Sequence, residues 1–202
     1  MPTEVLSSVA RTEFDADYYA RFYRDRRRRV AAEGDTARLC AFVAAYLGHL
    51  GVKVRSVLDL GCGLGWWRGP SQAAWPGVRY RGVEWSRHLC DTLGWTHGSV
   101  VDHAGAPADL VVCQGVLQYL SDRDAARALA NLGRLSRRAL YLEAVTEEDW
   151  NGLLDRARSD QDIHVRPAAF YRTRLARHFV SCGGGLYVPK AQARLFELEK
   201  GR

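Results

Sequence analysis

The chain has 202 residues, of which 47% are hydrophobic and 26% are charged, and it carries a formal net charge of +6. These proportions are ordinary for a globular protein and exclude collagen-like repeats, coiled coils and disordered chains. The length favours one domain over two. No stretch approaches the roughly 18 uninterrupted apolar residues that span a bilayer.

Cysteine use and the N-terminal residues bear on where the protein works. The five cysteines are odd in number and include no Cys-x-x-Cys pair, so they indicate neither a disulfide framework nor a zinc site. Glu4, Arg11, Glu13 and Asp15 interrupt any apolar segment of the kind that a secretory signal needs. We therefore expect a cytoplasmic protein with no bound metal and no membrane partner.

The positive charge is carried almost wholly by arginine, since only three of the 29 basic residues are lysines. A cationic surface attracts phosphates, so the run Arg26–Arg29 leaves nucleic acid open as a partner. The other interpretation is an arginine-rich composition with these residues on a solvated helix face. The absence of a nucleic-acid-binding motif favours that second interpretation.

Two helices are predicted ahead of the first strand, over residues 16–33 and 36–50, where apolar side chains recur at three- and four-residue spacing. Strand and helix patterns then alternate, which predicts a parallel sheet covered on both faces. The predicted strands are 56–60, 79–85, 108–113 and 139–144, and the helices between them are 66–75, 86–94 and 122–137.

The last third of the chain has a different pattern. Thr146 and Asp149 have the spacing of a helix cap, and Pro167 is placed to open another helix. Residues 178–190 and 193–200 then predict two neighbouring strands joined by a short turn, hence antiparallel. Because no linker rich in Pro, Gly or Ser and no internal repeat occurs, we expect one domain over residues 1–202.

The segment 57–66, VLDLGCGLGW, carries the chemistry. A buried strand ends in Asp59, and Gly61, Gly63 and Gly65 follow at alternate positions. Glycines there allow a sharp turn and let a ligand lie against bare main chain at the carboxyl edge of the sheet. The dinucleotide pattern G-x-G-x-x-G would need a glycine where Trp66 stands. A carboxylate also repels a pyrophosphate but suits an ammonium group, which favours a zwitterionic nucleoside over NAD.

At this point the sequence resembles the class I S-adenosylmethionine-dependent methyltransferases, over roughly residues 55–145. The resemblance implies that Asp59 and the three glycines hold the methionine part of the cofactor. It also implies that Glu84, at the end of the second strand, takes the ribose hydroxyls and that Trp85 lies on the adenine ring. S-adenosylmethionine is thus the expected cofactor.

The resemblance extends to the later strands. After the third strand, Ser99 stands where the family has an acid or polar residue near the adenine amino group, with Val100 beside it. This is a departure, because the nearest acid, Asp102, comes three residues later. Gln114, after the fourth strand, is expected beside the methionyl end. Tyr19, in an aromatic lead-in, is the candidate that covers the cofactor.

The fold implied is an α/β Rossmann-like three-layer sandwich, with a mostly parallel seven-stranded sheet of order 3-2-1-4-5-7-6 whose last strand is antiparallel. Residues 1–52 would supply helices over the cofactor pocket, and residues 53–145 the cofactor-binding core. Residues 146–202 would supply the acceptor side and the terminal strand pair.

The expected reaction is transfer of a methyl group to an oxygen or nitrogen of a small molecule, because the chain leaves no room for a separate recognition domain. Such acceptors often benefit from a base. His164, Tyr119 and Glu143 are the candidates, each with a plainer interpretation: a loop histidine bonded to backbone, a packing tyrosine and a strand-end acid paired with arginine.

Two alternatives stay open. One is methylation of RNA through the arginine-rich face, which the lack of an N-P-P-Y-like segment after the fourth strand disfavours. The other is a protein that binds S-adenosylmethionine without transferring its methyl group, since an intact loop argues only for cofactor binding. The oligomeric state is not indicated.

Overall fold

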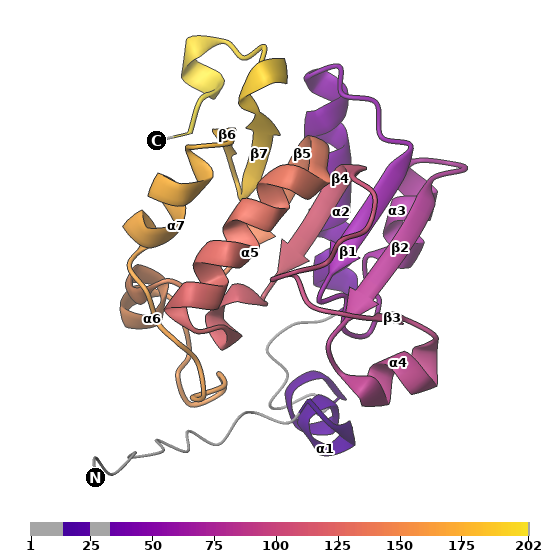
Figure 1. The fold of residues 1–202 in the computed structure, drawn as a ribbon, viewed down its shortest axis with the longest axis vertical. Helices are drawn as coiled ribbons and strands as arrows, with labels where there is room; N and C mark the ends of the chain where they lie inside the picture. The colour runs from indigo at the N-terminus through magenta and orange to yellow at the C-terminus, as the bar shows by residue number, and fades with distance from the viewer. Residues whose placement is uncertain (1–13, 25–32, 202) are drawn as a thin grey trace, which may run out of the picture.

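The structure is a computed structural model and describes residues 14–24 and 33–201. A seven-stranded sheet runs through its middle in the order β3-β2-β1-β4-β5-β7-β6, which confirms the predicted order (Figure 1). The strands are β1 (Ser56–Leu60), β2 (Arg79–Glu84), β3 (Thr96–His97), β4 (Ala108–Gln114), β5 (Ser136–Glu143), β6 (Phe179–Gly183) and β7 (Leu186–Pro189). Neighbours from β3 to β5 pair in parallel, whereas β7 is antiparallel to both β5 and β6.

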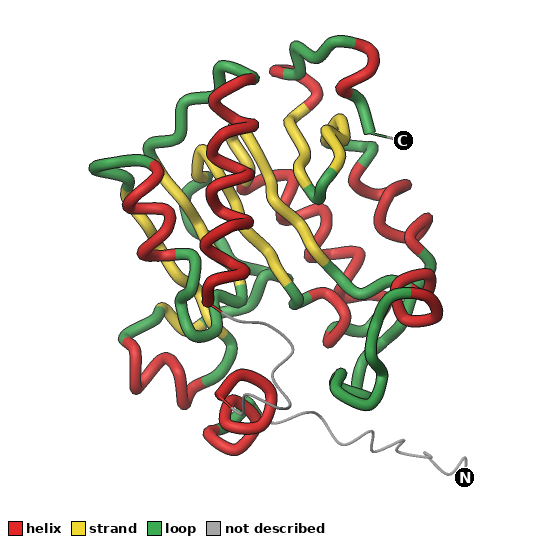
Figure 2. The backbone as a smooth tube through the Cα atoms, turned by 180° about the vertical axis from the view of Figure 1, so that it is seen from behind, coloured by secondary structure: helices red, strands yellow, loops and turns green. Residues whose placement is uncertain are grey.

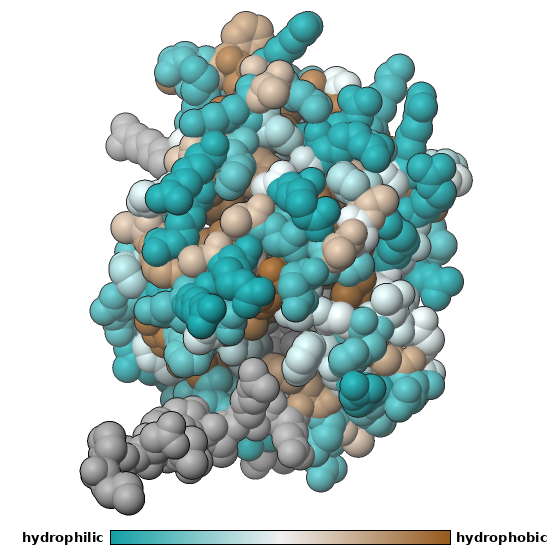
Figure 3. Space-filling view, viewed as in Figure 1, coloured by the Kyte–Doolittle hydropathy of each residue, from teal (hydrophilic) through white to brown (hydrophobic). Residues whose placement is uncertain are grey.

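Helices cover both faces of the sheet. Figure 1 shows α5 and α7 in front of the sheet, and Figure 2, from behind, shows α2 as the long helix across the opposite face. The helices are α1 (Ala16–Tyr19), α2 (Glu33–His49), α3 (Arg68–Ala74), α4 (Arg87–Leu93), α5 (Asp122–Leu135), α6 (Glu147–Gly152) and α7 (Ala168–Leu175). A π-helical segment, Ala20–Arg24, continues α1. The outer side of the front layer is largely hydrophilic, with small separated hydrophobic groups (Figure 3).

Alternate residues of the central strands feed two cores. On β1, Leu58 and Leu60 pack toward α5 and α7, while Val57 packs toward α2 and α3. All five β1 residues are buried, as a parallel strand covered on both faces requires. Asp59 therefore lies on the face of α2 and α3, in a position that would otherwise be apolar.

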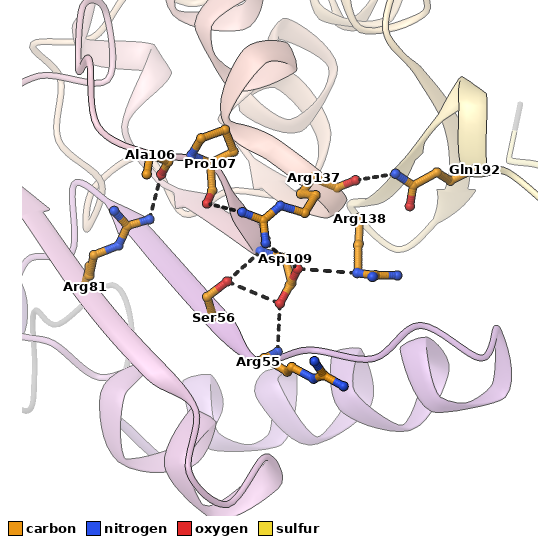
Figure 4. A network of polar contacts seen from close by, with 9 residues as sticks. All are labelled: Arg55, Ser56, Arg81, Ala106, Pro107, Asp109, Arg137, Arg138 and Gln192. Atoms are coloured by element: carbon orange, nitrogen blue, oxygen red, sulfur yellow. Dashed lines mark hydrogen bonds and ion pairs between the residues drawn. The ribbon is translucent and has the colours of Figure 1, made fainter.

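The amino ends of β1, β4 and β5 are joined by a polar network (Figure 4). Asp109 of β4, 4% exposed, accepts hydrogen bonds from the Arg55 backbone N–H and the Ser56 hydroxyl, and it pairs with Arg137 and Arg138 at 3.2 and 3.3 Å. Burial alone would raise the pKa of Asp109, but these hydrogen bonds and the two arginine charges hold its pKa below the ordinary value. The network ties three strands together at the edge remote from the glycine-rich turn.

The sequence-based elements are corrected at the C-terminus. The antiparallel pair is β6 and β7, both inside residues 178–190, and three consecutive glycines with φ of 78°, 56° and 76° reverse the chain between them. The predicted strand at 193–200 does not form, since that segment holds only the 3₁₀ turn Glu197–Glu199 and leaves Phe196 and Leu198 exposed. Alternation of apolar and polar residues does not make a strand when no neighbour pairs with it.

The first predicted helix, 16–33, is described only to residue 24, and the arginine run Arg26–Arg29 lies outside the described residues. In the parts of the chain that are described, no helix combines the length and apolar character needed to cross a bilayer.

Candidate active site

The glycine-rich turn leaves β1 at the switch point of the sheet, where β2 lies on one side and β4 on the other. Gly61, Gly63 and Gly65 have φ of 75°, 51° and 76°, which side chains rarely allow. A Cβ on Gly61 would lie 2.3 Å from Val116, and one on Gly65 2.4 Å from Trp95, whereas one on Gly63 would meet nothing within 4 Å. The first and third glycines thus let the turn pack, and the second leaves main chain bare.

Glu84, at the tip of β2, holds this turn from the side. Its Oε2 accepts the Gly63 N–H at 2.8 Å, and its Oε1 accepts the backbone N–H groups of Trp85 and Ser86 at 2.9 Å each. The side chain is 5% exposed. The carboxylates of Asp59 and Glu84 therefore lie at neighbouring strand tips, and Glu84 fixes the turn that Asp59 precedes.

Trp95 supports the turn from the outer side. Its indole N–H donates to the Gly63 carbonyl at 3.0 Å. The ring fits where Gly65 and Gly82 have no side chains, since a Cβ on either glycine would come within 2.6 Å of it. Sequence analysis missed this role of Trp95. Gly82 on β2 indicates that another group packs against the strand, but the sequence does not say which group.

A cavity of about 240 Å³ opens beside the turn. Asp59, Gly61 and Gly63 line one part of it, and Gln114, Gln118, Tyr119 and Glu143 line another. A further hollow of about 390 Å³ lies at the outer edge of β2 by Arg81 and His103, but none of the turn's residues lines it. The cavity at the switch point is therefore the candidate active site.

Asp59 has an unusual environment in this cavity. It is 2% exposed and accepts a hydrogen bond from the Tyr80 hydroxyl at 2.5 Å. Burial raises the pKa of its carboxyl to about 7; the bond from Tyr80 opposes that rise and the charge of Glu84 adds to it. No cationic side chain of the described residues pairs with it, so a cation bound in the cavity would stabilise its charged form.

Polar side chains continue along the carboxyl ends of β4 and β5. Gln114 accepts the Trp67 indole N–H at 2.8 Å and donates to Glu143 at 3.2 Å. Glu143 also accepts the Tyr141 hydroxyl at 2.9 Å, on the same oxygen. Glu143 is exposed and pairs with a glutamine and a tyrosine, so the structure does not bear out the plainer interpretation of an acid paired with arginine.

Arg166 positions the turn that follows β4. The guanidinium is buried, pairs with Asp122 at 2.7 Å and donates to the carbonyls of Leu117, Leu120 and His164. It thereby joins the turn that carries Gln118 and Tyr119 to the loop 159–167. Nothing in the sequence pattern marks this arginine, since its partners are main-chain carbonyls from a distant segment.

The N-terminal segment described by the structure, residues 14–24, lies at the carboxyl edge of the sheet, below the strand arrowheads in Figure 1. Ser86 donates to the Phe14 carbonyl on one side, and the Tyr18 and Tyr119 hydroxyls meet at 2.8 Å on the other. Tyr18 and Phe22 line the cavity, whereas the predicted Tyr19 is buried beside Tyr18 and does not line it.

The remaining predicted residues lie around the tips of β2 and β3 or in the late loop. Trp85 is 51% exposed and stacks on His97 at 5.4 Å. Ser99 accepts the Val101 N–H, and Val100 is buried in the core under α5. Neither these residues nor Glu84 line the cavity. The side chain of His164 is exposed and does not line it either, and its backbone N–H donates to the Gln118 carbonyl.

In the described ranges, no cluster of three His, Cys, Asp or Glu side chains could hold a metal ion. The cavity residues that sequence analysis did not single out include Tyr18, Trp150 and Asp160. Trp150 lies in α6, whose helix cap the sequence signals, whereas Asp160 lies in an irregular loop with no periodic pattern.

No protein-family model matches the chain, and no curated protein matches its sequence. Solved structures match its fold. The sugar N-methyltransferase KedS8 from Streptoalloteichus has a TM-score of 0.61 at 17% identity, over 94% of this chain and 96% of that one. DesVI from Streptomyces venezuelae gives 0.57 at 15%, over 77% and 91%. Magnesium protoporphyrin IX methyltransferase (ChlM) from Synechocystis, with bound S-adenosylmethionine, gives 0.52 at 17%, over 76% and 79%.

The chain therefore has the Rossmann-like fold of the class I methyltransferases, as the resemblance in sequence implies.

Proposed function

We propose that this protein binds S-adenosylmethionine and transfers its methyl group to an oxygen or nitrogen of a small-molecule metabolite. One observation carries the proposal: a buried carboxylate with no cationic partner, Asp59, lies beside bare main chain at the switch point of a methyltransferase fold.

The residues present fit that cofactor. The ammonium group of the cofactor's methionyl part would lie beside Asp59. The rest of that methionyl part would lie along Gly61 and Gly63, where no side chain fills the cavity. Gln114 would face the methionyl end. Glu84 would take the ribose hydroxyls, since each of its oxygens has more than one lone pair and Oε2 accepts only one hydrogen bond from the described residues.

At the adenine end, the proposal assigns an exposed aromatic ring, Trp85, to stacking, and Ser99 and Val100 to the ring's edge. Tyr19 keeps a place in the cover of the cofactor through its contact with Tyr18, which lines the cavity. These assignments would place the cofactor along the tips of β1, β2 and β3.

The cofactor, when bound, supplies a methyl group that its sulfonium makes electrophilic. What the protein adds is orientation, because holding the reacting groups in line can lower a barrier by up to about 7–11 kcal/mol. The Tyr18–Tyr119 contact joins the N-terminal segment to the turn after β4 at the cavity wall, and Arg166 holds that turn in place.

A small acceptor is supported by the modest size of the cavity and by the short segment between β5 and β6. The structural neighbours KedS8 and ChlM are described as methyltransferases of a sugar and of a porphyrin. We further propose a single domain over residues 1–202 and a cytoplasmic location, both of which rest on the sequence alone.

Calorimetry with S-adenosylhomocysteine tests the proposal. We expect the full chain to bind it and Asp59→Ala and Glu84→Ala each to abolish binding, while Glu147→Ala, at an exposed acid of α6, leaves it unchanged. Unchanged affinity in both site variants would refute the assignment. Release of S-adenosylhomocysteine from S-adenosylmethionine on incubation with candidate metabolites then separates a transferase from a protein that only binds.

A further inference from the structure

The part of the cavity beyond the glycine-rich turn is acidic. Glu143 and Asp160 both line it. Among the described residues that line the cavity there is no lysine, arginine or histidine, although the chain as a whole carries a net charge of +6. A cavity wall of one sign in a protein of the opposite net charge favours a ligand that brings the missing charge.

Gln118 supplies an independent observation. Its side chain is 6% exposed and lines the cavity, and its Nε2 donates to the Gly115 carbonyl at 2.9 Å. That bond fixes the orientation of the amide, and the buried Oε1 has no hydrogen-bond partner among the described residues. A buried acceptor without a donor destabilises the folded protein, so its presence points to a donor that arrives with a ligand.

Asp160 repeats the pattern on the opposite segment. Its Oδ1 accepts the Asp162 N–H at 3.0 Å, while its Oδ2 is buried and has no partner in residues 14–24 and 33–201. Gln118 and Asp160, which both line the cavity, thus each have an unsatisfied acceptor oxygen, and among the described residues Glu143 is bonded on one oxygen only, by Gln114 and Tyr141. The aromatic rings of Tyr18, Phe22 and Trp150 complete this part of the wall, and such rings also attract cations.

We infer that the methyl acceptor is an aliphatic amine, held through its N–H groups by Glu143, Asp160 and the Gln118 carbonyl. The inference rests on the proposed function and narrows its acceptor from oxygen or nitrogen to nitrogen. An ammonium offers several N–H donors and a positive charge. The donors match the three acceptor groups, and the charge matches the two of them that are carboxylates. An alcohol offers one donor and no charge.

The reaction balances with these groups. The bound ammonium first releases one proton to the Glu143 carboxylate, which is exposed and passes it to water. The nitrogen lone pair then forms the new N–C bond, the C–S bond breaks, and its electron pair remains on sulfur. A secondary amine keeps its remaining N–H on Asp160 or Gln118, so the same wall accommodates a second transfer.

Two matched probes test the inference without knowledge of the natural acceptor. Both are S-adenosylhomocysteine analogues in which nitrogen replaces sulfur, and the nitrogen carries either a 2-aminoethyl or a 2-hydroxyethyl arm. The arm occupies the acceptor part of the cavity. Calorimetry on the full chain should give the aminoethyl compound an affinity at least about tenfold higher, equivalent to 1.4 kcal/mol.

Variants locate the preference. Glu143→Gln and Asp160→Asn, both close in shape to the native residues, should each remove most of the tenfold ratio while the affinity for S-adenosylhomocysteine stays unchanged. Glu147→Gln, which does not line the cavity, should keep the ratio.

The outcomes are distinct. Equal affinities, a preference for the hydroxyethyl arm, or a ratio that survives in both site variants would overturn the inference and leave the proposed function standing. Failure of both probes and of S-adenosylhomocysteine to bind would overturn the proposed function itself, and the inference with it.

Discussion

Two buried aspartates on adjacent strands have opposite electrostatic environments. Asp109, at the amino end of β4, is surrounded by N–H and hydroxyl donors and two arginines, and its pKa lies below the ordinary value. Asp59, near the carboxyl end of β1, has one hydrogen bond from Tyr80, and burial raises its pKa to about 7.

The difference separates a group that stabilises the fold from one that serves a ligand. Asp109 has its partners within the protein and joins β1, β4 and β5. Asp59 is buried away from water, and no cationic side chain of the described residues pairs with it. Its ionisation therefore lowers the stability of the folded state. A carboxylate kept in that condition at a switch point is where an ammonium-bearing ligand gains most.

The largest change in the free energy of unfolding should come from removing Asp109, the aspartate whose hydrogen-bond and charge partners lie within the protein. Asp109→Ala removes two ion pairs and leaves buried donors without an acceptor, so we expect a loss of about 4 kcal/mol in the free energy of unfolding. Urea denaturation measures it. Asp124→Ala, at an exposed pair with Arg127, serves as the control and should cost under about 1 kcal/mol. A loss of similar size in both variants would contradict the structural role of Asp109.

Substitution of Asp59 should change the free energy of unfolding in the opposite direction. Because its pKa in the folded state is raised from 3.8 to about 7, its contribution to stability is full below pH 4 and is lost as the pH rises toward 7. Asp59→Asn removes this loss, so above neutral pH the variant should be more stable than the wild type by on the order of 3 kcal/mol. Denaturation from acid to mildly alkaline pH measures the gap. A variant that is less stable at every pH would contradict the environment described.

The two sides of this comparison differ in how well sequence predicts them. Strand β1 matches its predicted bounds, because a strand buried on both faces is a short apolar run, and the acid and glycines after it have few other uses. The elements after β5 are harder to predict from the sequence. Asp160 and Arg166 act from an irregular loop through contacts with distant residues, and Phe196 and Leu198 alternate like strand residues yet lie exposed.

Contact between the ligand and the bare main chain beside Asp59 can be tested by substituting two glycines of similar geometry. Gly63 has φ of 51° and Gly77 of 80°, and a Cβ on either meets nothing within 4 Å. Alanine at each should cost about 1 kcal/mol of stability through backbone strain. Only Gly63→Ala should also weaken S-adenosylhomocysteine binding, by about tenfold, since its methyl group enters the cavity. Equal affinities for the two variants would show that the turn does not contact the ligand.

The smallest effect is expected at the rim. Trp85→Ala should lower the affinity for S-adenosylhomocysteine by about three- to tenfold, the usual worth of one aromatic stacking partner, with no loss of stability. Phe196→Ala removes an aromatic ring that is 81% exposed and distant in sequence, and it should change neither quantity. An unchanged affinity in Trp85→Ala would remove the ring from the adenine site.

Proton release during ligand binding tests the central claim most directly. An ammonium placed beside Asp59 lowers a pKa that starts at about 7, so binding of S-adenosylhomocysteine must expel a proton from the carboxyl. Calorimetry at about pH 6.5, in two buffers of different ionisation enthalpy, should record a measurable fraction of a proton released per ligand bound. Asp59→Asn should release none and bind at least about tenfold more weakly. Binding without proton release, at an affinity that the substitution leaves unchanged, would contradict the account.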